Sequence, residues 1–139
     1  MTESRNEELS RFAELLIKSV RDPAIEACDR LAAGKMRGPN GNRWGTLLTD
    51  DQARRSIREL IPDIVDQTIF EFLDAADNAQ LPVAWQCKDG SFCLLDDLGQ
   101  GEMCGWLMGS PGWRHEYSSK RFFDPLANLK PEPDKTKEN

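Results

Sequence analysis

Three side chains in the C-terminal third of the chain could together carry out nucleophilic chemistry. Cys104 supplies a thiol, His115 is the only histidine, and Glu116 follows it directly. A thiol activated by an imidazole that a carboxylate orients is a common arrangement for covalent catalysis. One hypothesis is therefore a small enzyme that uses these residues in a pocket under the aromatic segment 105–125.

The cysteine spacing argues against a metal site. The chain has no CxxC pair among its four cysteines, Cys28, Cys87, Cys93 and Cys104, whereas structural zinc sites usually contain such pairs. A two-residue hairpin turn at Asp89-Gly90 would pair Cys87 with Phe92 and send Cys87 and Cys93 to opposite faces. We therefore expect buried free thiols, with no metal, no disulfide and no cofactor.

Carboxylates surround an aromatic ring on one predicted helix, which extends from Pro62 to about Asn78. At 100° per residue, Phe70 falls in the middle of the acidic side, away from the apolar stripe. An aromatic ring among carboxylates is typical of an interface anchor, because the ring supplies contact area and the charges orient a basic partner. The candidate partner-binding residues are Asp63, Asp66, Phe70, Asp74 and Asp77.

Two other interpretations of this acidic side remain open. It is simply a solvated surface, as most charged helix faces are, or another element covers it. The segment from Trp113 to Phe123 could cover it and bring Arg114, Lys120 and Arg121 to the carboxylates.

Composition narrows the classes of partner. The formal charge is −6, from 24 acidic and 18 basic residues, which argues against sequence-independent binding to nucleic acid phosphates. No segment approaches the roughly 18 consecutive apolar residues of a membrane span, and the N-terminal MTESRNEELSRF lacks a signal-peptide core. We expect a cytoplasmic protein with reduced cysteines, without a membrane or nucleic acid partner.

Apolar spacing predicts helices through the first half of the chain. Over residues 7–20, apolar side chains recur every three or four positions, which predicts one helix. Asp22-Pro23 is expected to begin a second helix that extends to about Ala33. The glycine-rich residues 34–45 are predicted to form a loop. Thr49 or Asp50 is expected to cap a third helix that ends at Ile61. Pro62 is expected to begin a fourth helix, whose core-facing stripe includes Ile61, Ile64, Val65, Thr68, Ile69, Phe72, Leu73 and Ala76.

Alternating apolar residues after Pro82 predict strands. Two strands flank the Asp89-Gly90 turn, a third is expected at 103–107, and a short helical turn is expected to carry Phe122 and Phe123. The predicted fold class is α+β: about four N-terminal helices, then a small three-stranded antiparallel meander and a short C-terminal helical turn. We expect one globular domain over residues 1–130 and a disordered polar tail over 131–139.

These features favour a non-catalytic protein-interaction module that binds a basic protein through its acidic helical face. A short acidic chain with an aromatic residue in an acidic patch resembles, in general outline, bacterial immunity proteins and toxin inhibitors, and the resemblance implies a toxin as the partner. The alternatives are the small enzyme described above and a homo-oligomer subunit whose self-interface includes Phe70. Negative charge on both copies of that surface opposes the last alternative.

Overall fold

The computed structural model describes residues 2–126, so the predicted tail at 131–139 lies outside the described residues. It is a mixed helical structure with one small two-stranded antiparallel sheet. In chain order the elements are α1 (Thr2–Leu16), the π-helical turn η1 (Ile17–Arg21), α2 (Asp22–Ala32), α3 (Pro39–Leu47), α4 (Asp51–Asp77), β1 (Ala84–Gln86), β2 (Phe92–Leu94), α5 (Leu95–Gly99), α6 (Met103–Met108) and α7 (Trp113–Tyr117).

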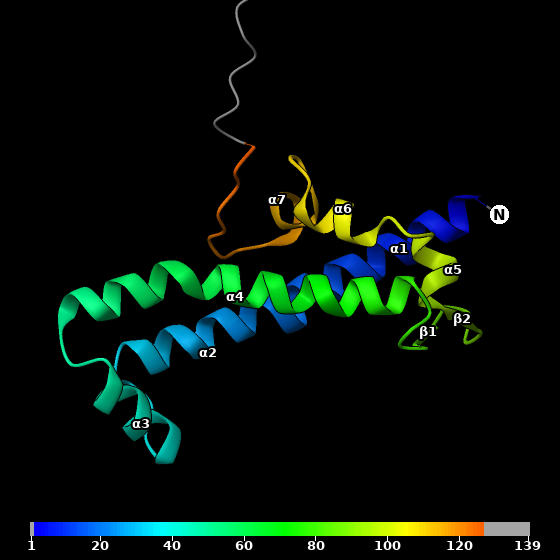
Figure 1. Ribbon diagram of the computed structural model, residues 1–139. Helices are drawn as coiled ribbons and strands as arrows, with labels where there is room; N and C mark the ends of the chain where they lie inside the picture. The colour runs from blue at the N-terminus through cyan, green and yellow to red at the C-terminus, as the bar shows by residue number, and fades with distance from the viewer. Residues whose placement is uncertain (1, 127–139) are drawn as a thin grey trace, which may run out of the picture.

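One long helix, α4, organises the molecule. The helices α1 and α2 run beside it in the opposite direction, α5, α6 and α7 cover another of its sides, and α3 lies at its N-terminal end (Figure 1). Of the two predicted caps, Thr49 and Asp50, the structure has Asp50, whose carboxylate accepts a hydrogen bond of 2.7 Å from the backbone N–H of Ala53 at the start of α4. No helix among the described residues is both long and apolar enough to cross a membrane.

The predicted helix break at Pro62 is wrong, because Pro62 lies inside α4. A proline within a helix has no N–H to donate to the carbonyl four residues earlier, which here belongs to Arg58. The Nη2 group of Arg121 donates a hydrogen bond to the Arg58 carbonyl instead. Ile61 and Pro62 are both buried, so the packing of this helix face also favours a continuous rod.

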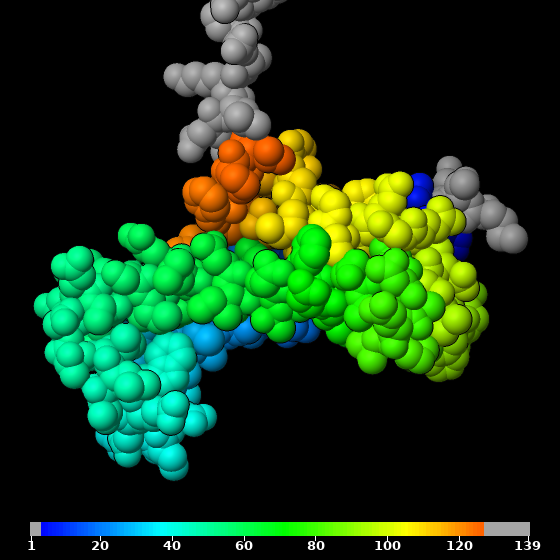
Figure 2. All heavy atoms as spheres, in the orientation of Figure 1, coloured from blue at the N-terminus to red at the C-terminus, as the bar shows by residue number. Residues whose placement is uncertain are grey.

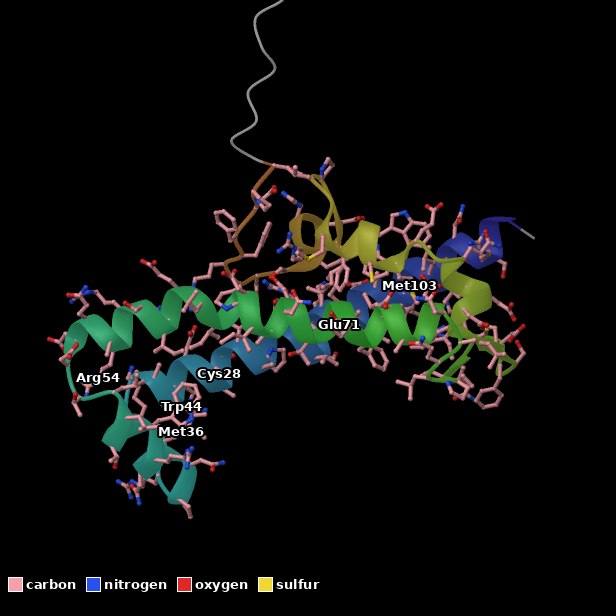
Figure 3. The ribbon with its side chains drawn as sticks, viewed as in Figure 1. Cys28, Met36, Trp44, Arg54, Glu71 and Met103 are labelled. Atoms are coloured by element: carbon pink, nitrogen blue, oxygen red, sulfur yellow. The ribbon has the colours of Figure 1, made fainter. Side chains whose placement is uncertain are left out.

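The predicted loop over residues 34–45 is wrong in its second half, which forms α3. Gly38, with a φ of 97°, precedes this helix, and Pro39 occupies its first turn, where a missing N–H costs nothing. Gly41 is buried against the preceding chain, since a Cβ there would lie 2.1 Å from the Met36 carbonyl oxygen. Trp44 of α3 and Cys28 of α2 both pack against the buried residues Ile25 and Ile61, at the end of the molecule formed by α2 and α3 (Figure 3).

The predicted third strand is also wrong, because residues 103–108 form the helix α6. Met103 and Leu107, four residues apart, are both fully buried against the core, which is the spacing of one helix face. The predicted helical turn at Phe122 and Phe123 is misplaced as well: α7 ends at Tyr117, and the chain from 118 to 124 has no regular structure.

The buried side chains form two clusters. The larger joins α1 and η1 to α4, α5, α6 and α7, and it includes Phe12, Ile17, Leu73, Met103 and Trp113. The smaller lies between α2, α3 and the N-terminal half of α4 around Ile25 and Ile61. Together they hold α4 on the side that faces the rest of the molecule.

Candidate functional site

A buried cluster of charged side chains fixes one face of α4. Asp66 is 2% exposed and accepts hydrogen bonds from two arginines, Arg21 and Arg114, which are themselves fully buried. Arg21 Nε lies 2.6 Å from Asp66 Oδ1, and Arg114 Nη1 lies 3.0 Å from Asp66 Oδ2. The two guanidinium groups thus share one carboxylate between η1, α4 and α7.

A second carboxylate balances the charge of this cluster. Asp22 Oδ1 lies 3.1 Å from Arg21 Nη1, and the same carboxylate accepts hydrogen bonds from the Ser118 hydroxyl and the Ser119 backbone N–H. Arg114 also donates to the backbone carbonyls of Leu107 and Phe123. The cluster therefore ties the chain after α7 to η1 and α4.

Three of the five predicted partner-binding residues are not simply solvated. Asp66 belongs to the buried cluster, so its carboxylate does not lie on the surface. Asp77 accepts hydrogen bonds from the backbone N–H groups of Gly101 and Met103, at 2.9 and 3.1 Å, and thereby holds the start of α6. Phe70 is half-buried and packs against the larger core cluster.

The alternative in which the segment from Trp113 to Phe123 covers this side agrees with the Arg114–Asp66 contact. Arg121 and Lys120 point elsewhere, because their acidic partners are Asp29 and Glu26 of α2. Asp63 and Asp74 stay exposed, and Asp74 accepts a hydrogen bond only from Asn78 among the described residues.

The open side of α4 carries apolar as well as acidic side chains. Ile64 is 55% exposed and Leu60 is 52% exposed. A shallow hollow at this place is lined by Leu60, Asp63, Ile64, Gln67, Thr68 and Glu71. We call these six residues the outer face of α4. In Figure 2 the side of α4 turned to the viewer is uncovered, and Glu71 lies on it in Figure 3.

The position of Ile64 corrects the predicted apolar stripe. The sequence assigned Ile64 and Thr68 to the core, yet both are exposed, while Ile61, Ile69 and Leu73 are buried as expected. The predicted apolar stripe on this helix is wider than the roughly 100° of a typical core-facing stripe. This excess width is the sequence signal that could have identified the exposed surface. Ile64 falls at the edge of the stripe.

The acids next to this hollow have no cationic partner within residues 2–126. No lysine, arginine or histidine nitrogen described by the structure lies within 4.0 Å of the carboxylates of Glu59, Asp63, Glu71 or Asp74. The basic residues of α4, Arg54, Arg55 and Arg58, all precede Glu59. The exposed part of the helix after residue 58 therefore has a net negative charge.

The structure does not bring Cys104 and His115 together. The Cys104 thiol donates to the Phe70 carbonyl at 3.3 Å. Burial, followed by the charges of Asp74, Asp77 and Glu71, raises the pKa of this thiol, which is the opposite of activation.

The ring nitrogens of His115 have other partners. Nδ1 accepts from the Gly112 backbone N–H at 3.1 Å, and Nε2 lies 2.9 Å from Asp124 Oδ2. A hollow beside the aromatic segment is lined by His115 and Glu116 but not by Cys104. This geometry does not support the predicted nucleophile and base pair.

The cysteines of the hairpin lie differently from the prediction. Trp85 is opposite Cys93 and Gln86 is opposite Phe92, so the expected pairing of Cys87 with Phe92 is wrong. The Sγ atoms of Cys87 and Cys93 are 3.6 Å apart, and all four cysteines are free thiols. Within residues 2–126, no group of three or more His, Cys, Asp or Glu side chains could hold a metal ion.

No protein-family model, no curated protein and no solved structure matches this chain. Its own geometry therefore carries the functional argument.

Proposed function

We propose that the chain is a protein-binding module whose outer face of α4 docks onto a basic protein. The observation that carries the proposal is the exposure of Leu60 and Ile64 beside acids that lack a cationic partner in the described part of the chain. Apolar contact at the centre supplies binding free energy, and a charged rim supplies orientation and association rate.

The apolar anchor in this proposal is Ile64 instead of Phe70. Phe70 packs against the core, whereas Ile64 stands about two turns earlier on the open side. Asp63, Glu71 and Asp74 are the proposed rim, and their charges require lysines or arginines on the partner. A toxin that the chain inhibits is the proposed class of partner, in line with the resemblance to immunity proteins.

A defined probe tests the proposed face directly. We would titrate isotope-labelled full-length chain with an amphipathic helical peptide of lysine and leucine and follow backbone amide shifts. The proposal expects shifts concentrated over residues 59–74, abolished by high salt. Shifts spread over every acidic segment of the chain would contradict it.

Matched variants then distinguish binding at the outer face of α4 from non-specific attraction to any acidic surface of the chain. Ile64→Ser and Glu71→Lys should each weaken peptide binding by about tenfold or more, whereas Asp97→Lys, the same charge change at an exposed acid of α5, should not. The same variants can be used as baits in a cell lysate. The natural partner is the protein that the wild type and Asp97→Lys capture but Ile64→Ser and Glu71→Lys do not. An equal loss of binding in Asp97→Lys would refute a local site. If ultracentrifugation shows a wild-type dimer that Ile64→Ser converts to monomer, the outer face of α4 serves self-association instead.

A further inference from the structure

Two thiols meet on one face of the hairpin. The Cys87 thiol donates to Cys93 Sγ over 3.6 Å, and both side chains are half-buried. A disulfide has a sulfur–sulfur distance of about 2.05 Å, so the two sulfur atoms need to approach by only about 1.5 Å. Cys28 and Cys104 have no thiol contact within residues 2–126.

The length of the turn creates this contact. Cys87 N–H donates to the Ser91 carbonyl at 2.7 Å, and Gly90 N–H donates to the Cys87 carbonyl at 2.9 Å, so the loop has three residues, 88–90. Gly90, with a φ of 90°, takes the left-handed position that such loops need. The extra loop residue shifts the register by one and brings Cys93 to the face that carries Trp85 and Cys87.

The two thiols differ in their access to solvent molecules. Cys87 lines an open hollow between the hairpin loop and α1, together with Glu7, Arg11 and Lys88. Cys93 does not line this hollow, and burial, followed by its contact with Cys87, raises its pKa to about 11. A reagent that enters the hollow therefore meets Cys87 first.

We propose that Cys87 and Cys93 form a dithiol site that reduces small-molecule disulfides and closes a disulfide across the hairpin. The Cys87 thiolate attacks one sulfur of the reagent R–S–S–R, the S–S bond breaks, and one RS⁻ leaves and takes up a proton. Cys93 then loses its proton to solvent, and its thiolate attacks Cys87 Sγ and expels the second RS⁻. Two protein thiols are oxidised by two electrons, and the reagent is reduced to two thiols.

Oxidised glutathione added to the native full-length chain tests this reaction. Intact-mass spectrometry should show the loss of two hydrogen atoms, and peptide mapping should find the Cys87–Cys93 link. The reaction should be at least tenfold faster than adduct formation at Cys28 or Cys104. In Cys93→Ser the reaction should stop at a glutathione adduct on Cys87, and in Cys87→Ser the hairpin should react at least tenfold more slowly.

Controls separate the folded geometry from simple closeness in sequence. Cys28→Ser and Cys104→Ser should react as the wild type does. In a glutathione redox buffer, the ratio of disulfide to dithiol should be at least tenfold higher in the folded chain than in the same chain in urea. Equal ratios in the two states, adducts at Cys28 or Cys104 at the same rate, or a Cys87 adduct that Cys93 does not displace would each overturn the proposal.

Discussion

Arg21 and Asp66 form a two-point ion pair inside the protein, with Nε to Oδ1 at 2.6 Å and Nη2 to Oδ2 at 3.2 Å. The three side-chain nitrogens of Arg21 make five hydrogen bonds, to Asp66, Asp22, Ser118 and the Arg121 carbonyl. Taking both charges out of water is costly, and only such complete pairing offsets the cost. The pair therefore fixes how η1, α4 and the chain after α7 fit together.

Replacing Asp66 should be the most damaging charge change on α4. We expect Asp66→Asn to lower the free energy of unfolding by about 3–5 kcal/mol, because it leaves Arg114 buried without a negative partner and Arg21 with Asp22 alone. Urea denaturation measures the loss. Asp63→Asn, at an exposed position on the same helix, should stay within about 0.5 kcal/mol of wild type, and equal effects at both positions would contradict the buried cluster.

Two apolar residues of α4 should respond differently to truncation. Phe70 packs against the core, whereas Ile64 is 55% exposed. We expect Phe70→Ala to cost about 2–3 kcal/mol, somewhat less than a fully buried phenylalanine, and Ile64→Ala to cost less than about 1 kcal/mol. Thermal unfolding of the two single variants distinguishes them, and the reverse order would place the proposed anchor in the core.

Apolar spacing predicts α1, α2 and the two halves of α4, but it predicts neither α3, nor the continuity of α4 through Pro62, nor the register of the hairpin. An Asp89-Gly90 pair suits both a two-residue and a three-residue turn, since each needs a left-handed glycine. Contacts from a distant helix accompany the observed register: Trp85 lies edge-on to Phe12 and donates to Glu8 at 2.9 Å. Likewise, the apolar run 103–108 fits a strand or a helix until its neighbours are known.

The candidate site was predictable only in part for the same reason. Helical periodicity correctly left Asp63 and Asp74 on the surface, yet it also grouped Asp66 and Asp77 with them. Their partners, Arg21 and the backbone of Gly101 and Met103, are far away in sequence. One helix wheel contains no information about which acids such distant groups will bind.

Glu8 should make the stability of the protein depend on pH in the acidic range. Its carboxylate accepts the Lys88 backbone N–H at 2.8 Å and the Trp85 indole N–H, and these bonds lower the pKa of Glu8 below its ordinary 4.5. The stabilisation is full above pH 4.5 and is lost as the pH falls through the lower pKa of the folded state.

Denaturation at a series of pH values from neutral to acidic measures this contribution. Glu8→Gln should be less stable than wild type near neutral pH, and the difference should shrink in acid. Glu7→Gln, at an exposed neighbour without a side-chain hydrogen bond in the described part of the chain, should keep the wild-type slope. An unchanged slope in Glu8→Gln would show that Glu8 does not anchor the hairpin to α1.

Arg121 and Pro62 should be energetically coupled through the Arg58 carbonyl. Pro62 cannot donate to this carbonyl, and Arg121 Nη2 donates to it, while Nη1 of the same guanidinium group lies 2.6 Å from Asp29 Oδ2. Since the Arg121 side chain is partly exposed, we expect Arg121→Ala to cost about 1–2 kcal/mol in the wild-type chain. In the Pro62→Ala background a new N–H at position 62 can bond to the carbonyl, so the same change should cost roughly 1 kcal/mol less.

Asp29→Asn is the control for this cycle, because it weakens the ion pair and leaves the Arg58 contact in place. Its cost should be the same in both backgrounds. Urea denaturation of the four chains and the two control chains gives the coupling free energy directly. If Arg121→Ala costs the same with and without Pro62, the guanidinium does not compensate for the missing helix hydrogen bond, and packing around Ile61 alone keeps α4 continuous.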